Sequence, residues 1–152
     1  MKTRKNVKGF TLVELIVVIA IIGVLAAILV PSMLGYVRKS KVSAANSNAK
    51  SLYDAVATSL VELDSEGNGG ASLNGDHTWT ASPAAGSLDA KIVNYFDGVS
   101  ALVAGGGSAE YRVNSMACTA AYVFDGTYRG GYPIGSTVDN STTTFDLNAA
   151  ER

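Results

Sequence analysis

Apolar residues concentrate near the start of this chain of 152 residues, where the run from Phe10 to Val30 carries a single charge, that of Glu14. As an α-helix rising about 1.5 Å per residue, the run measures about 31 Å, the thickness of the hydrocarbon core of a bilayer. The pattern therefore predicts a helix able to span a membrane, over residues 10–35.

The apolar pattern changes in the next segment, residues 36–64, where apolar residues recur at spacings of three and four. This spacing places them on one face of a helix, while polar residues such as Asn46 fall elsewhere. We therefore predict one long helix from about Phe10 to about Leu63, apolar in its first half and amphipathic in its second. The apolar stripe consists of Val42, Ala45, Ala49, Leu52, Val56, Leu60 and Leu63.

The remaining residues, 65–152, have the composition of a small globular head. Glycines at 67, 69 and 70 are expected to end the long helix, and the stretch up to residue 87 to form a loop. Ser87 is placed to cap a short helix through Phe96, and Asp125-Gly126 signals a hairpin. Strands are predicted over residues 110–116, 119–124, 127–132 and 142–147. The fold class is α+β, with a small antiparallel β-sheet packed on the long helix.

Glu14 separates three interpretations of the apolar run. A secretory signal peptide has an apolar stretch of roughly 7 to 15 residues, which is shorter than this run, and an acid inside it argues against that interpretation. A plain transmembrane anchor leaves the acid unexplained, because a carboxylate inside a bilayer costs a few kcal/mol without a partner. Cleavage between Gly9 and Phe10 would instead create an amine, largely protonated at neutral pH, one helical turn from Glu14. Among packed helices, the carboxylate could pair with the amine of a neighbour and fix the axial register.

The stretch GFTLVE at residues 9–14, followed by the apolar run and Pro31, resembles the N-terminal signature of type IV pilins and related pseudopilins. The resemblance covers about the first 40 residues. It implies that residues 1–9 are a basic leader, that a prepilin peptidase cuts after Gly9, and that the new amine of Phe10 is methylated. It also implies that the mature helices form a filament core, in which Glu14 pairs with the N-terminus of an adjacent subunit.

Pro31 and Gly35 follow the apolar run closely. Proline removes a backbone donor and clashes with the preceding turn, and glycine adds backbone freedom, so we expect the helix to kink or locally unwind there. Because the corresponding region of pilins can unwind in the filament, the resemblance favours an elastic segment over a simple break at the membrane surface.

The partners that the resemblance implies are further copies of the chain, the prepilin peptidase, a pilus assembly platform and, before assembly, the cytoplasmic membrane. Charge gives no reason to expect nucleic acid, since the formal net charge is −1, and without the four cations of the first nine residues it is 8 minus 13, or −5. A local cluster of Arg38, Lys39 and Lys41 is explained better by contact with lipid at the membrane surface.

Residues able to support catalysis are few. The chain has one histidine, His77, and one cysteine, Cys118, without a supporting acid at a recognisable spacing. No enzyme and no cofactor are therefore expected. Trp79 could stack on a sugar or on a neighbouring subunit, and core packing explains it at least as well. Since a single cysteine cannot form an intramolecular disulfide, the C-terminal region must be held by strands or other bonds, unlike in many pilins.

Oxygen-bearing side chains at Asp64, Glu66 and Asn68, with a glycine in the sixth position, echo the start of a calcium-binding loop. The echo fails at the twelfth position, because Gly75 stands where a bidentate glutamate belongs. A solvated turn after the helix is therefore preferred, with Ca²⁺ at these three residues as a weak alternative.

The sequence thus predicts a structural subunit of a type IV pilus-like extracellular filament, held in the cytoplasmic membrane by a single span and displayed on the cell surface after assembly. The nearer alternative is a pseudopilin of a type II secretion or DNA-uptake machine. The more distant alternative is a membrane-anchored binding module that never polymerises. Adhesion, twitching motility, DNA uptake and secretion share this N-terminus, so the sequence does not choose among them, nor between a major and a minor subunit.

Overall fold

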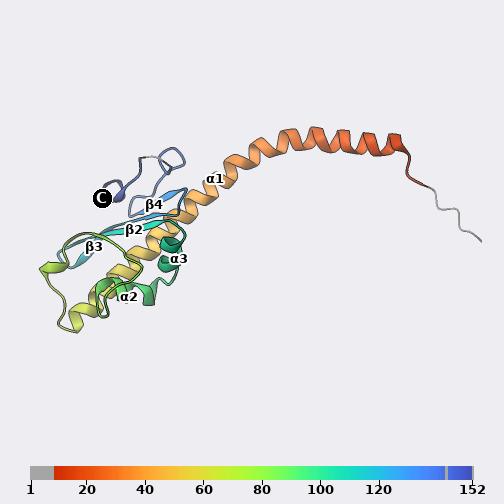
Figure 1. The fold of residues 1–152 in the computed structure, drawn as a ribbon. Helices are drawn as coiled ribbons and strands as arrows, with labels where there is room; N and C mark the ends of the chain where they lie inside the picture. The colour runs from red at the N-terminus through yellow and green to blue at the C-terminus, as the bar shows by residue number, and fades with distance from the viewer. Residues whose placement is uncertain (1–8, 143, 152) are drawn as a thin grey trace, which may run out of the picture. The chain divides into compact units, whose positions relative to one another are not determined.

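The computed structural model describes residues 9–142 and 144–151 (Figure 1). The chain forms two compact units, which divide between Val37 and Arg38. The helix α1, Leu12–Ser65, contributes its first half to the first unit and its second half to the second. Each unit is described by itself below.

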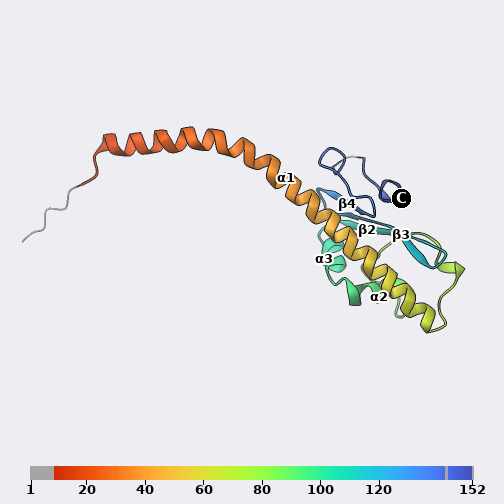
Figure 2. The same ribbon diagram turned by 180° about the vertical axis from the view of Figure 1, so that it is seen from behind.

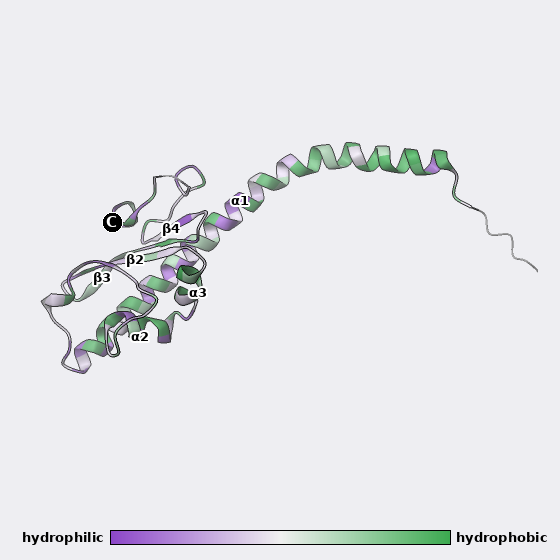
Figure 3. Ribbon diagram, viewed as in Figure 1, coloured by the Kyte–Doolittle hydropathy of each residue, from purple (hydrophilic) through white to green (hydrophobic). Residues whose placement is uncertain are grey.

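The first unit consists of a short non-helical lead-in and the first half of α1 (Figure 3). Every side chain from Gly9 to Val37 is exposed, including the large apolar ones. Mean hydropathy over the most apolar window of this helix reaches 3.1, and none of that window is buried. Since an isolated apolar helix cannot remain bare in water, this surface requires lipid or other protein around it.

The second half of α1 carries the buried stripe that the sequence predicts. All seven residues of the stripe are buried, together with Ala55 and Ser59, which extend it. The helix ends at Ser65 in a Schellman motif, in which the Asn68 N–H donates to the Leu63 carbonyl at 2.9 Å and the Gly67 N–H to the Asp64 carbonyl at 3.0 Å. Gly67 has φ of +75°, a conformation that glycine adopts without strain.

A four-stranded antiparallel sheet in the order β1-β2-β3-β4 packs against this half of α1 (Figure 2). Its strands are Gly75–Thr78, Ser108–Asn114, Ala117–Phe124 and Arg129–Tyr132. Between β1 and β2 lie α2, Leu88–Tyr95, and α3, Gly98–Ala104; a single 3-10 turn, Ala71–Leu73, precedes β1. A short α4, Leu147–Ala150, follows the sheet.

The sheet is buried on two faces. Tyr111, Ala121 and Val123 face α1 and join the main core with Leu52, Val56, Leu60 and Ile92. Ala120 and Tyr122 alternate with them along β3 and face Phe145, Leu147 and Ala150 of the C-terminal segment. Strand β3 is therefore covered by α1 on one side and by the C-terminal segment on the other.

The α+β fold, the long helix and the small antiparallel sheet are confirmed. The short helix capped by Ser87 is also present, with the Ser87 hydroxyl accepting from the Ala90 N–H at 3.3 Å. The Asp125-Gly126 hairpin joins β3 to β4, and the Asp125 carboxylate accepts from the N–H groups of Thr127 and Tyr128 at 2.9 and 2.7 Å.

Three details of the predicted head are wrong. Residues 65–87 are not loop throughout, because they contain β1, which pairs Gly75 with Val113 and Thr78 with Glu110. Strand β2 ends at Asn114, and the turn into β3 is formed by Ser115 and Met116 at φ of 51° and 62°. The third concerns residues 142–147, treated next.

The described residues of 142–147 form turns and the start of α4 rather than a strand. Asp146 caps α4, since its carboxylate accepts from the Ala149 N–H at 2.9 Å. Phe145 and Leu147 then pack on the outer face of the sheet. A cap and two apolar contacts thus override the β-branched composition of this stretch.

Candidate assembly site

The segment around Gly9 and Phe10 is exposed and precedes the first helical residue, Leu12. Phe10 is 82% exposed, and a Cβ built on Gly9 would have no neighbour within 4 Å. The peptide bond between these two residues is therefore open to another protein. The cleavage there stays a prediction, and residues 1–8 of the predicted leader lie outside the described residues.

Glu14 and Thr11 form a reciprocal cap at the start of α1. The Glu14 carboxylate accepts from the Thr11 backbone N–H at 2.9 Å and from its hydroxyl at 2.7 Å. The Thr11 hydroxyl in turn accepts from the Glu14 backbone N–H at 3.2 Å. This arrangement is a capping box, in which Thr11 is the N-cap and Glu14 stands at the third helical position.

The capping box was not predicted, although its signal is present in the sequence. A threonine followed three residues later by glutamate, just before an apolar run, is the pattern of a helix start. The finding adds a partner for Glu14 within its own chain. Its carboxylate also lies where the helix dipole favours negative charge. The predicted pairing of Glu14 with the amine of an adjacent subunit therefore has to compete with, or add to, an existing local contact.

Pro31 and Gly35 both lie inside α1, whose helical assignment is continuous across them. A Cβ at Gly35 would meet nothing within 4 Å. The structure therefore shows no unwound residue at these two positions, and the expected kink and the elastic role in a filament stay predictions.

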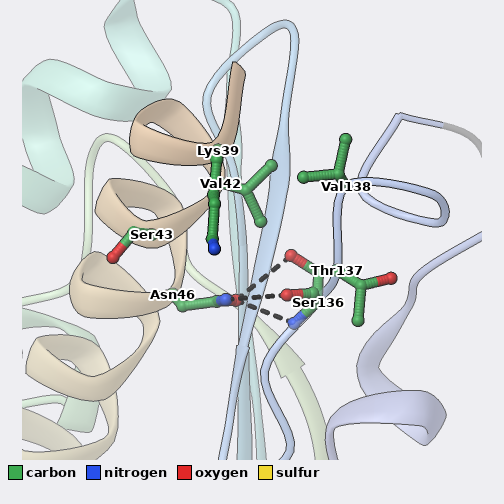
Figure 4. A pocket seen from close by; sticks show the side chains of 7 residues that line it. All are labelled: Lys39, Val42, Ser43, Asn46, Ser136, Thr137 and Val138. Carbon is green, nitrogen blue, oxygen red and sulfur yellow. Dashed lines mark hydrogen bonds between the residues drawn. The ribbon is translucent and has the colours of Figure 1, made fainter. Parts of the chain in front are cut away.

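The second unit holds its C-terminal segment through one amide side chain on α1. The Asn46 Oδ1 accepts from the backbone N–H of Gly131 at 3.1 Å and from the N–H and hydroxyl of Ser136 at 2.8 and 3.1 Å. Its Nδ2 donates to the Ser136 carbonyl at 2.9 Å (Figure 4). We call these four bonds the Asn46 node.

Two glycines permit the close approach at the Asn46 node. A Cβ on Gly130 would lie 2.1 Å from the Ala45 carbonyl carbon, and one on Gly135 would lie 2.9 Å from the Asn46 side chain. Backbone of β4 therefore touches backbone of α1, a distance at which only glycine fits.

Arg112 provides a second tie to the C-terminal segment. Its guanidinium donates to the Asp76 carboxylate at 2.5 and 2.9 Å, to Asn148 at 2.8 Å, and to the Glu151 carboxylate. Arg112 holds the pKa of the Asp76 carboxyl below its ordinary value by donating these bonds. Strand β1, strand β2 and α4 are thus joined through one side chain. With the Asn46 node, these bonds hold a C-terminal region in which Cys118 is a free thiol.

Contacts within the head account for the positions of Cys118, Trp79 and His77. Cys118 is buried, and its burial raises the pKa of the thiol to about 12, which disfavours the reactive thiolate. Trp79 is 3% exposed in the main core, and its Nε1–H donates to the Asp89 carbonyl at 3.1 Å. The His77 ring stacks on Tyr111 with centroids 5.1 Å apart. Core packing, rather than stacking on a sugar, is thus the observed role of Trp79.

The three residues that resemble the start of a calcium-binding loop lie at the end of α1 and just after it. Asp64 and Asn68 supply backbone groups to the Schellman motif, and the Glu66 carboxylate accepts from the Lys91 ammonium at 2.8 Å. Among the described residues, no group of three or more histidine, cysteine or acidic side chains is placed to hold a metal ion. Calcium at Asp64, Glu66 and Asn68 stays an untested, weaker alternative to a solvated turn.

Comparison with known proteins extends the resemblance beyond the N-terminus. Residues 4–30 match the family model described as the prokaryotic N-terminal methylation motif. The chain is 47% identical over 57 residues to the type IV major pilin protein PilA of Myxococcus xanthus, a match that covers 38% of this chain and 26% of that protein. It is 46% identical over 55 residues to a type IV major fimbrial protein FimA of Dichelobacter nodosus, which is 36% of this chain and 35% of the relative. The chain thus spans only about a quarter to a third of these two relatives.

A further FimA of Dichelobacter nodosus matches over most of both chains. The identity is 32% over 140 residues, which cover 80% of this chain and 84% of the relative. No solved structure gives a significant match to the chain. The chain belongs to the type IV pilin family, as this alignment shows and as its capped apolar helix, amphipathic second half and small antiparallel sheet agree.

Proposed function

We propose that the chain is the structural subunit of a type IV pilus-like filament, held in the cytoplasmic membrane until a peptidase cuts after Gly9. The cut frees the amine of Phe10 for methylation, and the mature helices then polymerise. The family assignment supports this proposal, because the matched relatives are named as major pilin and major fimbrial proteins.

The observation that carries the proposal is the fully exposed apolar surface of the first unit. Its large side chains, from Phe10 to Val37, are each between 47% and 82% exposed. A helix so apolar on all sides is stable only in lipid or among other apolar helices. Storage in a membrane and burial in a filament core supply these two environments in turn.

The chemistry of assembly follows from the first helical turn. Before cleavage, Glu14 has its own Thr11 as partner, which reduces the cost of placing a carboxylate in lipid. After cleavage, the protonatable amine of Phe10 adds a positive charge at the same end of the helix. Pairing of this amine with Glu14 of an adjacent copy would set the axial register of the packed helices, because only one offset brings the two groups together.

Small residues in the same helix support close packing in the filament. Gly23, Ala20, Ala26 and Ala27 leave room for neighbouring helices, which in an apolar medium associate by packing rather than by the hydrophobic effect. A Cβ built on Gly23 would meet nothing within 4 Å, so the space beside it is open in the single chain.

No enzymatic activity is proposed, since the matched relatives are structural proteins by name. The head supplies the surface of the filament in this proposal, and the platform and peptidase act on the N-terminal segment. A pseudopilin would share these steps and differ in the length of the fibre it builds.

Two measurements on the same cells test the proposal. Mass spectrometry of the mature chain is expected to show an N-terminus at a methylated Phe10. Electron microscopy is expected to show long surface filaments that disappear when the gene is deleted. An intact Met1 would refute processing and favour the non-polymerising anchor, and a mature N-terminus without surface filaments would favour the pseudopilin.

A further inference from the structure

A groove with both polar and apolar side chains in its lining lies beside the Asn46 node, between α1 and the loop that follows β4 (Figure 4). Its volume is about 370 Å³. Lys39 and Val42 line it from α1, and Thr137 and Val138 line it from the loop. In Figure 4 the Lys39 side chain extends from α1 toward the level of Asn46.

Lys39 brings an uncompensated positive charge to this groove. Among the residues that the structure describes, no hydrogen bond or ion pair joins its ammonium to another group. By contrast, Lys91 pairs with Glu62 and Glu66, and Arg112 pairs with Asp76 and Glu151. Lys39 is thus available to an external anion.

The helix around Lys39 has no acid that would compete for the ammonium. Between Glu14 and Asp54 the sequence contains no aspartate or glutamate, while Arg38 and Lys41 flank Lys39. The acid nearest in sequence across the groove, Asp139, is exposed and does not line it. The α1 side of the groove therefore carries positive charge.

The position of Lys39 along the chain matches the headgroup layer of a membrane. Lys39 follows residue 35, the end of the predicted span, by four residues and Val30, the end of the apolar run, by nine, so the helix places its backbone about 6 to 14 Å beyond the hydrocarbon core. The headgroup layer on each side of a bilayer is about 5 to 8 Å deep. A lysine side chain can extend back toward the bilayer and bring its ammonium to the phosphate groups, with its methylene stem against apolar side chains.

We propose that the groove binds the phosphate of an anionic phospholipid while the subunit is held in the membrane. The Lys39 ammonium pairs with the phosphate oxygens, and Val42 and Val138 contact the apolar part of the headgroup region. The Thr137 hydroxyl, which donates to the Asn140 Oδ1 at 3.3 Å in the single chain, turns to donate to the phosphate instead. The proposal rests on the membrane storage proposed above. It goes further by assigning the head a lipid site, one that the subunit must vacate when it leaves the membrane for the filament.

Lys41 offers a matched control. It lies two residues from Lys39, carries the same charge and is exposed, but it does not line the groove. At 3.6 residues per turn the two side chains point about 200° apart around the helix. A diffuse attraction to an anionic surface would involve both lysines equally, whereas a groove would involve Lys39.

The test uses the full chain in nanodiscs of phosphatidylcholine with an increasing fraction of phosphatidylglycerol. Amide NMR shifts of Ser136, Thr137 and the Asn46 side chain are expected to move and to saturate as this fraction rises. Lys39→Gln is expected to weaken the apparent affinity about tenfold, and Lys41→Gln by less than about threefold.

Five outcomes would overturn the proposal. Equal effects of Lys39→Gln and Lys41→Gln would show diffuse attraction only. Shifts reproduced by inorganic phosphate in pure phosphatidylcholine would make free phosphate the ligand. Groove shifts that appear only on filament formation would assign the groove to a second copy of the chain. A chain that stays in the nanodiscs without groove shifts refutes the groove alone, whereas a chain that leaves them refutes the membrane anchor as well.

Discussion

The carboxylate of Glu14 lies 2.9 Å from the backbone N–H of Thr11 and 2.7 Å from its hydroxyl, inside a run of apolar side chains. The helix start therefore supplies two donors to the acid in the single chain. An acid that is already satisfied locally can be carried into lipid at lower cost than a bare one. Glu14 can thus serve the subunit twice, first as a cap and then as an intersubunit partner.

Two substitutions at Glu14 separate the cap from the charge. Glutamine keeps the capping geometry without the charge, and alanine removes both. Both variants are expected to insert into the membrane at least as well as the parent chain. Because the charge pair is missing, the filament yield of both is expected to fall at least about tenfold. Flotation measures insertion, and sheared filaments measure assembly. Normal filaments from Glu14→Gln would show that capping is the whole role of Glu14.

Gly9→Val is expected to block processing. The space around Gly9 is open, so the added branched side chain would not clash within the chain itself. It is expected to obstruct the binding of the peptidase instead. Mass spectrometry should then find the precursor rather than the mature chain, with processing reduced at least about tenfold. Gly23→Val, in an equally open site within α1, serves as the control and should be cut normally. Undiminished yield of mature protein from Gly9→Val would contradict the assigned site.

Asn46→Ala is expected to destabilise the head by about 2 to 4 kcal/mol, because it leaves the N–H groups of Gly131 and Ser136 without their acceptor. Asn48→Ala is the control, since Asn48 makes no hydrogen bond to another described residue. Fluorescence of the single tryptophan, Trp79, reports unfolding from within the core. Equal stability of the two variants in denaturant titrations would show that the Asn46 node does not stabilise the head.

Gly130→Ala is expected to cost at least about 3 kcal/mol, since its Cβ would collide with the backbone of Ala45 rather than with a movable side chain. Gly70→Ala is the matched control, because the nearest atom to its Cβ would be the Ser72 hydroxyl oxygen at 4.0 Å. Thermal unfolding of the full chain in detergent micelles measures both. A variant Gly130→Ala as stable as the control would contradict the close approach of β4 to α1.

The head is expected to lose stability in acid through Asp76. Because Arg112 lowers the pKa of Asp76 in the folded chain, the unfolded chain binds this proton more readily. The stabilisation of the folded head by this ion pair is therefore fully present above the pKa of Asp76 in the unfolded chain, near 4. It is lost as the pH falls through the lower pKa of the folded chain. Asp76→Asn should be less stable at neutral pH and should lose less stability on acidification. Asp97→Asn, at an exposed acid without a cap hydrogen bond, should behave like the parent chain. An unchanged pH dependence in Asp76→Asn would refute this ion pair.

The sequence predicts the parts of the fold that repeat a local signal. Val42, Leu52 and Leu60 recur at helical spacing and all face the core, because the period of the pattern and the period of the helix coincide. Ser87 caps α2 for an equally local reason. The capping box of Thr11 and Glu14 has an equally local signal and can be predicted from the sequence in the same way.

Other features depend on residues far apart in the chain. The four residues of β1 have no alternation of their own and become a strand because β2 pairs with them, Gly75 opposite Val113. The Asn46 node joins residues 90 positions apart, so the sequence marks Asn46 only as a polar residue of the helix. The same applies to the groove, because Lys39 and Thr137 meet only in the folded head.

A density map of the assembled filament at side-chain detail tests the central claim most directly, by measuring the distance from the Glu14 carboxylate to the nearest Phe10 amine of a neighbouring subunit. We expect an ion-pair distance of about 4 Å or less, repeated at every subunit. A filament in which the two groups lie well over about 10 Å apart, with no other cation near Glu14, would contradict the account.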